Sequence, residues 1–242
     1  MDMTDKAEVI QYTIGMSNGF FIRQGETVLA VDGGGELNAD AYLEVCAKNG
    51  IDPKKIKLII LTHGHVDHFV TLGVVKELTG APLLCHKKAE KDVREGLEPR
   101  VSGRNKIGKI VLEIQAKMGN PISFIPKVEP DILIEGEYDL KPWGVDGKLI
   151  ETPGHSADSI SVVLETGDVL VGDLIAAPPE GPVTLAFLSD IAGDPDCNKI
   201  LYESVGKVLA GARCIYSGHG GPYTPEEVYE AWERDKAEFA EA

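Results

Sequence analysis

Three of the six histidines in the chain lie in one six-residue segment, HGHVDH, which begins at His63. By composition such a segment is expected in on the order of one chain in ten thousand, so chance is a poor explanation. An apolar run ending at Leu61 precedes it and predicts a buried strand. At the end of an extended strand, residues two apart point the same way, so His63 and His65 face one side with Asp67 in line. His68 follows where the chain turns into a helix, so this loop can serve two neighbouring sites.

Two further histidines and one aspartate occupy similar settings, each after an apolar run. His155 stands in the sequence PGHS at 153–156, and His219 stands in SGHGG at 217–221. Asp173 ends a third apolar run. Glycines beside such residues let the backbone turn tightly and approach a bound ion. Four strand ends therefore supply five histidines and two aspartates, the donors that suit zinc and also non-haem iron.

These motifs resemble, in the expected order over residues 28–220, the metal motifs of the metallo-β-lactamase-fold hydrolase superfamily, in its glyoxalase II and lactonase-like branch. The resemblance implies an α/β fold of αββα type, a four-layer sandwich of two mixed sheets with outer helices. It also implies metal ions at one edge of the sandwich. No linker-like composition interrupts the sequence, which predicts one domain over residues 1–242. The implied ligands are His63, His65 and His155 for one ion, Asp67, His68 and His219 for the second, and Asp173 as the bridge between them.

The chemistry of such a pair of ions is hydrolytic. Two ions roughly 3.5 to 4 Å apart share a water and lower its pKa towards neutrality, while one ion polarises the substrate carbonyl. Asp67 is the expected catalytic residue, because it both binds metal and orients the attacking hydroxide. We therefore predict a metal-dependent hydrolase that cleaves an ester, thioester, lactone or amide bond of a small molecule. The expected cofactors are two divalent ions, zinc in the first place, with iron and manganese as alternatives.

Two other functions remain open at this stage. The persulfide dioxygenases of the same superfamily share these motifs but use one iron, held at the positions of His63, His65 and Asp173. Imidazole and carboxylate serve both metals, so the residue types do not separate the two reactions. A metal-binding or scaffold protein without activity is the third possibility, and the intact Asp67 argues against it.

The chain departs from familiar members of the superfamily at two loops. After His68 many relatives carry a pair of glycines, where this chain has residues 69–72, FVTL. After His155 a glycine often follows three residues on, where this chain has Asp158. These differences concern the loops around the substrate. The glyoxalase II-like thioesterases also add a helical C-terminal domain, whereas only about one helix is predicted after Gly221.

Some residues near the motifs have simpler interpretations. Asp32 resembles an Asp-x-Gly of the superfamily and is expected to fix the loop beneath the metals. His86 lacks a partner motif and is interpreted as a structural or surface residue. Tyr223 could reach the pocket but is more simply a solvated or packing residue. The loops at residues 87–127 and 176–193 are expected to border the substrate. The candidates there are Pro178, Pro179 and Phe187 for an apolar wall and Lys87, Lys88 and Arg94 for an anionic group.

The pattern of apolar residues and caps predicts the elements that carry these motifs. We expect a hairpin of residues 20–23 and 28–31, a helix from the N-cap Asn38 to Lys48, strands at 57–61, 82–85, 148–152, 159–165, 168–174 and 213–216, a helix with Asp194 as N-cap and Pro195 as first residue, and a last helix opened by the capping box Thr224–Glu227. Residues 87–127 are expected to form helices and loops over one edge of the site.

The overall charge limits the partners. The 242 residues include 24 Lys and Arg against 39 Asp and Glu, a formal net charge of −15, which repels nucleic acid and anionic membranes. The N-terminus has no signal-like apolar segment and no later window reaches the roughly 18 apolar residues of a membrane span, so we expect a cytoplasmic protein. Four dispersed cysteines, without a C-x-x-C pair, are expected to be buried free thiols.

Overall fold

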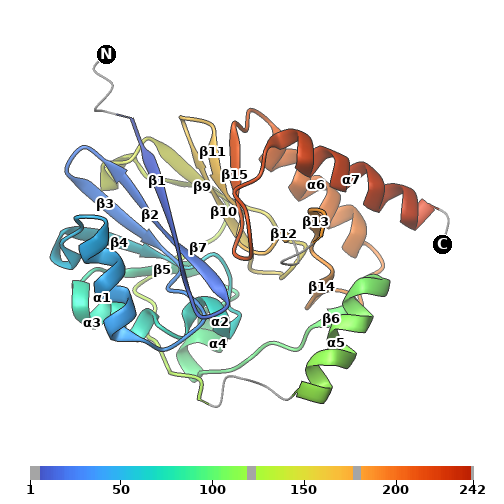
Figure 1. Cartoon of the computed structure of the whole chain (residues 1–242), viewed down its shortest axis with the longest axis horizontal. Coiled ribbons are helices and arrows are strands. Elements are labelled where there is room, and N and C mark those ends of the chain that lie inside the picture. The colour runs from blue at the N-terminus through green and yellow to red at the C-terminus, as the bar shows by residue number, and fades with distance from the viewer. Residues whose placement is uncertain (1–5, 119–123, 177–180, 241–242) are drawn as a thin grey trace.

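Two β-sheets lie face to face between two layers of helices in the computed structural model of the protein (Figure 1). The structure describes residues 6–118, 124–176 and 181–240. Its elements are β1 (Glu8–Ile14), β2 (Ser17–Gln24), β3 (Thr27–Val31), α1 (Ala39–Lys48), β4 (Ile56–Ile60), α2 (Val66–Phe69), α3 (Leu72–Thr79), β5 (Leu83–His86), α4 (Glu90–Glu95), β6 (Ser102–Gly103), α5 (Lys106–Met118), β7 (Ile132–Ile134), β8 (Tyr138–Asp139), β9 (Gly147–Glu151), β10 (Ile160–Leu164), β11 (Asp168–Leu170), β12 (Ile175–Ala176), β13 (Thr184–Leu185), β14 (Leu188–Ser189), α6 (Cys197–Leu209), β15 (Cys214–Tyr216) and α7 (Pro225–Ala240), with 3-10 turns at Pro53–Lys55 and Lys141–Trp143.

Both large sheets are mixed. The first has the strand order β1-β2-β3-β4-β5-β7, antiparallel from β1 to β3 and parallel from β3 to β7. The second has the order β15-β11-β10-β9-β8, antiparallel except for the parallel pair β11 and β15. Two short pairs, β12 with β13 and β14 with β6, lie beside them. The loops that follow β4, β9, β11 and β15 carry the predicted metal ligands.

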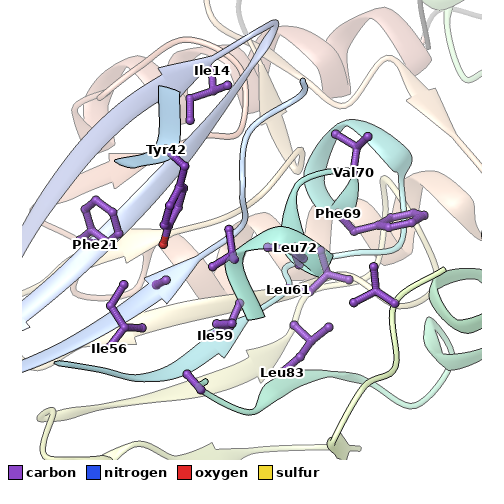
Figure 2. Close-up of a cluster of buried hydrophobic side chains, with 14 of the residues drawn as sticks. Ile14, Phe21, Tyr42, Ile56, Ile59, Leu61, Phe69, Val70, Leu72 and Leu83 are labelled. Carbon is purple, nitrogen blue, oxygen red and sulfur yellow. The ribbon is translucent and has the colours of Figure 1, made fainter. Parts of the chain in front are cut away.

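Strict alternation of apolar side chains builds the layers. Leu58 and Ile60 of β4 point towards the second sheet, whereas Ile59 and the adjoining Leu61 point towards the helices. On the helix side these residues join Leu72 of α3 in one buried cluster (Figure 2). Such a strand is apolar on both faces, as predicted for residues 57–61.

A third cluster completes the sandwich on the far side of the second sheet. Val169 and Ile215 from the sheet pack there with Leu201 of α6 and Val228 of α7. Helices therefore cover the outer face of each sheet, and the predicted αββα four-layer sandwich is confirmed. No helix among the described residues is both long enough and apolar enough to cross a membrane.

Most predicted elements are present, with ends that differ from the prediction by up to four residues. The helix predicted from Asp194 begins two residues later, at Cys197, with Asp196 as its N-cap. The Asp194 carboxylate accepts the N–H of Asp196 at 2.8 Å, which makes these residues a turn before the helix. The strand predicted over 168–174 ends at Leu170, and Gly172, with φ +53°, turns the chain away from the sheet.

Residues 87–127 form α4, β6 and α5 in the described part, and β6 pairs with β14 of the segment after residue 181. Residues 119–123 and the prolines at 178 and 179 lie outside the described residues. The prediction of an apolar wall at Pro178 and Pro179 is therefore untested.

Candidate metal centre

Three buried imidazoles form the first group of the centre, which we call the first histidine group: His63, His65 and His155. The first two follow β4, and the third lies in the loop between β9 and β10. The Nδ1 atom of His65 lies 2.8 Å from the Nε2 atom of His155. One ligand atom from each residue fits within 4.8 Å of the others, which is compact enough for one ion.

A second group, Asp67, His68, Asp173 and His219, lies beside the first and is more open to solvent. Asp67 Oδ2 lies 3.1 Å from His219 Nε2 and 3.8 Å from His68 Nε2. The side chains of His219 and Asp67 are 29% and 19% exposed, whereas that of His68 is fully buried. Solvent therefore reaches the centre on the side of Asp67 and His219.

Asp173 is the member of the second group that also lies close to the first histidine group. Its Oδ2 atom is 3.2 Å from His219 Nε2 and 3.7 Å from His155 Nε2. Its Oδ1 atom is 3.3 Å from His68 Nε2. This is the placement that a bridging carboxylate requires, and all seven residues predicted from the sequence meet in one place.

The histidine rings are oriented by bonds at their outer nitrogens. In four of the five histidines the Nδ1 atom contacts a hydrogen-bond acceptor, and the Nε2 atom therefore faces the centre. The pairs are His63 with Thr62 Oγ1 at 3.1 Å, His68 with Asp32 Oδ2 at 2.9 Å, His155 with the Leu188 carbonyl at 3.0 Å and His219 with the Met16 carbonyl at 2.9 Å.

Asp32 binds the start of the HGHVDH loop and one of its histidines, as expected. Its carboxylate accepts the N–H of Thr62 at 2.8 Å and the Thr62 hydroxyl at 2.7 Å, in addition to its contact with His68. Its φ of +54° lies in the left-handed region, which aspartate tolerates better than most residues. One buried carboxylate thus orients ligands of both groups.

The sequence did not predict a role for the start of β2, where two side chains bind the backbone of loops that carry metal ligands. The Ser17 hydroxyl donates to the Asp67 carbonyl, and the Asn18 side chain donates to the carbonyls of Ser217 and Gly220 at 2.9 and 2.8 Å. Only the burial of two adjacent polar residues at the start of a strand could have pointed to them, and burial is not visible in the sequence.

At Gly218 the backbone passes so close to two ligands that a side chain would collide with them. A Cβ atom at this position would lie 2.3 Å from Asp173 Oδ1 and 2.5 Å from His68 Cε1. Only glycine allows the backbone before His219 to pass this close to the two ligands.

Burial and charge shift the pKa values of the histidines in the two groups in opposite directions. Burial, reinforced by the neighbouring imidazoles, holds the pKa of His63 well below its ordinary range and lowers that of His155 to about 4. Burial also opposes the charged form of His219, but the carboxylates of Asp173 and Asp67 outweigh it and raise its pKa to about 10. For Asp67 the cost of burial is outweighed by His68 and His219, which lower its pKa to about 2.

Several polar atoms of the centre have no hydrogen-bond partner among the described residues. They are Nε2 of His63, His65 and His68 and Oδ1 of Asp173, all buried. Such atoms cost free energy unless something binds them. Imidazole and carboxylate donors that converge in this way fit divalent metal ions, so the residues present fit the metals that the motifs predict.

Other residues singled out in the sequence stand apart from the centre. His86 is buried and its Nε2 atom bonds Glu151 Oε1 at 2.8 Å, which links β5 to β9, so it is structural. Tyr223 is also buried, and its hydroxyl donates to the His219 carbonyl at 3.3 Å. All four cysteines are free thiols, three of them buried and Cys214 partly so.

The basic residues expected near an anionic substrate are engaged in surface contacts. Lys87 pairs with Glu135 at 2.5 Å, and Arg94 pairs with Glu129 at 2.7 Å. The Lys88 ammonium donates to the Ala157 carbonyl at 3.2 Å.

This fold and centre define a class of protein, and the comparisons agree. The model of the metallo-beta-lactamase superfamily matches residues 12–229, and the chain belongs to that superfamily. It is 30% identical over 215 residues to a probable metallo-hydrolase of Methanocaldococcus jannaschii, covering 84% of this chain and 93% of the relative. It is 44% identical over 204 residues to metallo-beta-lactamase domain-containing protein 1 of Rattus norvegicus, covering 81% of this chain and 62% of that protein. Among solved structures, the B3 metallo-beta-lactamase BLEG-1 shares the fold at 20% identity with a TM-score of 0.65, covering 92% of this chain and 97% of that one.

Proposed function

We propose that this metallo-hydrolase family member holds two divalent metal ions, zinc in the first place, and hydrolyses an ester, thioester, lactone or amide bond of a small molecule. The observation that carries the proposal is the position of Asp173, whose carboxylate lies close to histidines of both groups. His63, His65 and His155 would hold one ion, and Asp67, His68 and His219 the other. Bound there, the ions supply Lewis acidity for the substrate carbonyl and lower the pKa of water.

Asp67 is the residue we assign to the reacting side of the centre. Its pKa of about 2 keeps the carboxylate ionised at neutral pH, and its partial exposure lets water and substrate approach. An ionised carboxylate accepts hydrogen bonds only, so Asp67 can orient a water molecule by accepting a hydrogen bond from it. The Nε2 atom of His219, which is also partly exposed, lies 3.1 Å from Asp67 Oδ2 and keeps Asp67 in place.

Elemental analysis of protein purified without added metal tests the proposal. About two divalent ions per chain are expected. Asp67→Ala and His155→Ala should each lose the ion that the substituted residue holds, and with it hydrolysis of ester, thioester and lactone substrates. His86→Gln is the matched control, because it changes a buried histidine outside the centre and can still bond Glu151. About one iron per chain with oxygen-dependent thiol chemistry would replace the proposal with the dioxygenase reaction, and full activity of Asp67→Ala would refute the role of that residue.

A further inference from the structure

Asp158 joins the two segments that carry the first histidine group. It lies in the loop between β9 and β10, three residues after His155, and is only 7% exposed. Its Oδ2 atom accepts the backbone N–H of Gly64 at 2.8 Å, across 94 residues of sequence. Gly64 stands between His63 and His65, so one carboxylate connects the backbone of two ligands to the loop of the third.

The contact belongs to a regular pattern along the HGHVDH loop. Three alternate backbone N–H groups each donate to a carboxylate: Thr62 to Asp32 at 2.8 Å, Gly64 to Asp158 at 2.8 Å and Val66 to Glu98 at 2.9 Å. The residues between these N–H groups are the ligands His63 and His65. Of the three carboxylates, Glu98 is exposed, whereas Asp32 and Asp158 are buried, where a charge-assisted bond is stronger.

The loop that carries Asp158 is itself anchored. The Asp190 carboxylate accepts the N–H of Ala157 at 3.1 Å, and the Asp190 N–H donates to the His155 carbonyl at 3.1 Å. The Asp158 carboxylate is therefore held in place rather than mobile. The packing around Gly64 is equally close, since a Cβ atom there would lie 3.1 Å from Asp158 Oδ2 and 3.4 Å from Ala89 Cβ.

We propose that Asp158 is a positioning residue for the ion of the first histidine group, which fixes the backbone between His63 and His65 relative to His155. The inference rests on the proposed function, since it concerns one of the two proposed ions. Residues that orient metal ligands without touching the metal commonly change metal affinity 10- to 100-fold when they are substituted. A residue that only stabilises the fold would instead weaken both ions together.

The test is the affinity of each ion, measured by Co²⁺ titration of the metal-free protein with absorption as the readout. The band that disappears in His155→Ala identifies the ion of the first histidine group. We expect Asp158→Ala to weaken that ion about 10- to 100-fold and to leave the other within about twofold. Asp158→Asn should be intermediate, because the amide oxygen still accepts the Gly64 N–H without the charge. Equal weakening of both ions, or no change in either, would overturn the inference.

A charge-only control is available at Asp92, a half-buried residue whose pKa is raised by burial and by the nearby charge of Asp158. Asp92→Asn removes a neighbouring charge and keeps the Gly64 contact, so both affinities should stay unchanged. If Asp92→Asn weakens the first ion as much as Asp158→Asn does, net charge and not position is responsible. Circular dichroism of each metal-free variant checks that the chain is folded.

The Gly64 side of the contact gives a second, independent measurement. Gly64→Ala should weaken the first ion in the wild-type background, because its Cβ presses on the Asp158 carboxylate. In the Asp158→Ala background the same change should have a much smaller effect, since the oxygen is gone. Full additivity would contradict the inference. A wild-type protein that binds no Co²⁺ or Zn²⁺ would refute the proposed function, whereas two ions with unaffected Asp158 variants would refute only the role of Asp158.

Discussion

The protonation of the ligands differs between the two groups of the centre before any metal binds. Burial and the neighbouring imidazoles outweigh the charge of Asp173 and keep the imidazoles of His63 and His155 neutral at pH 7. His68 and His219 share the carboxylates of Asp173 and Asp67, which outweigh burial, hold the pKa of His68 well above its ordinary range and raise that of His219 to about 10. In the metal-free protein the second group therefore holds protons that the first group lacks.

This asymmetry predicts a difference in proton release. A metal binds only neutral imidazole, so the second ion must displace protons from His68 and His219, whereas the first ion displaces none from His63 and His155. Because the folded pKa of His219 is about 10, affinity for the second ion should rise with pH from 7 towards 10, by up to about tenfold per pH unit for each proton. Calorimetric titration of Zn²⁺ in buffers of different ionisation enthalpy measures the release. His155→Ala isolates the second ion, and equal release for both ions would contradict the prediction.

At the scale of elements, helix caps determine where the loops of the centre rejoin regular structure. The loop that carries His219 runs from β15 to α7, and α7 begins with the expected capping box. The Thr224 N–H donates to Glu227 Oε2 at 2.8 Å, and the Glu227 N–H donates to Thr224 Oγ1 at 3.2 Å. Both bonds are made within four residues, so the start of α7 is locally encoded.

Removing this cap should lower the stability of the fold without emptying the centre. Thr224→Ala deletes the acceptor for the Glu227 N–H, which costs about 1 kcal/mol of unfolding free energy. Thr224→Ser, which keeps the hydroxyl, is the control and should lose only a fraction of that. Urea denaturation of the two variants gives the difference, and metal content per chain should remain that of the wild type. A loss of metal in Thr224→Ala alone would show that the cap also positions His219.

The same distinction between local and distant contacts explains what the sequence could predict. The caps at Asn38 and Thr224 and the strands with alternating apolar residues depend on neighbours within a few positions, and they are present. Met16, whose carbonyl holds His219 from 203 residues away, acts through its backbone and has no residue-type signal. Asp158 was recognisable only as a departure from the superfamily pattern. Its partner, the Gly64 N–H, became apparent once the fold brought two loops together.

At the scale of the whole molecule, the centre lies where the two sheets meet. The HGHVDH segment follows β4 of the first sheet, whereas His155, Asp173 and His219 follow strands of the second sheet (Figure 1). Each proposed ion would therefore be bound by ligands from both sheets. Leu58 and Ile60 belong to the apolar core between the sheets, and His86 with Glu151 is a polar contact between them, so the ions would add a further polar link at one edge of that interface.

Metal removal should consequently destabilise the entire sandwich. A ligand that binds only the folded state, present at a thousand times its dissociation constant, stabilises it by about 4.1 kcal/mol. For a chain of this size, each kcal/mol moves the melting temperature by about 2 to 4 °C, so loss of one such ion lowers it by roughly 8 to 16 °C. Thermal denaturation with and without a chelator, followed by circular dichroism, measures the shift. The double variant His155→Ala/His219→Ala, which lacks a ligand from each group, should melt at the same temperature in both conditions. A wild-type melting temperature that the chelator leaves unchanged would mean that no ion links the two sheets.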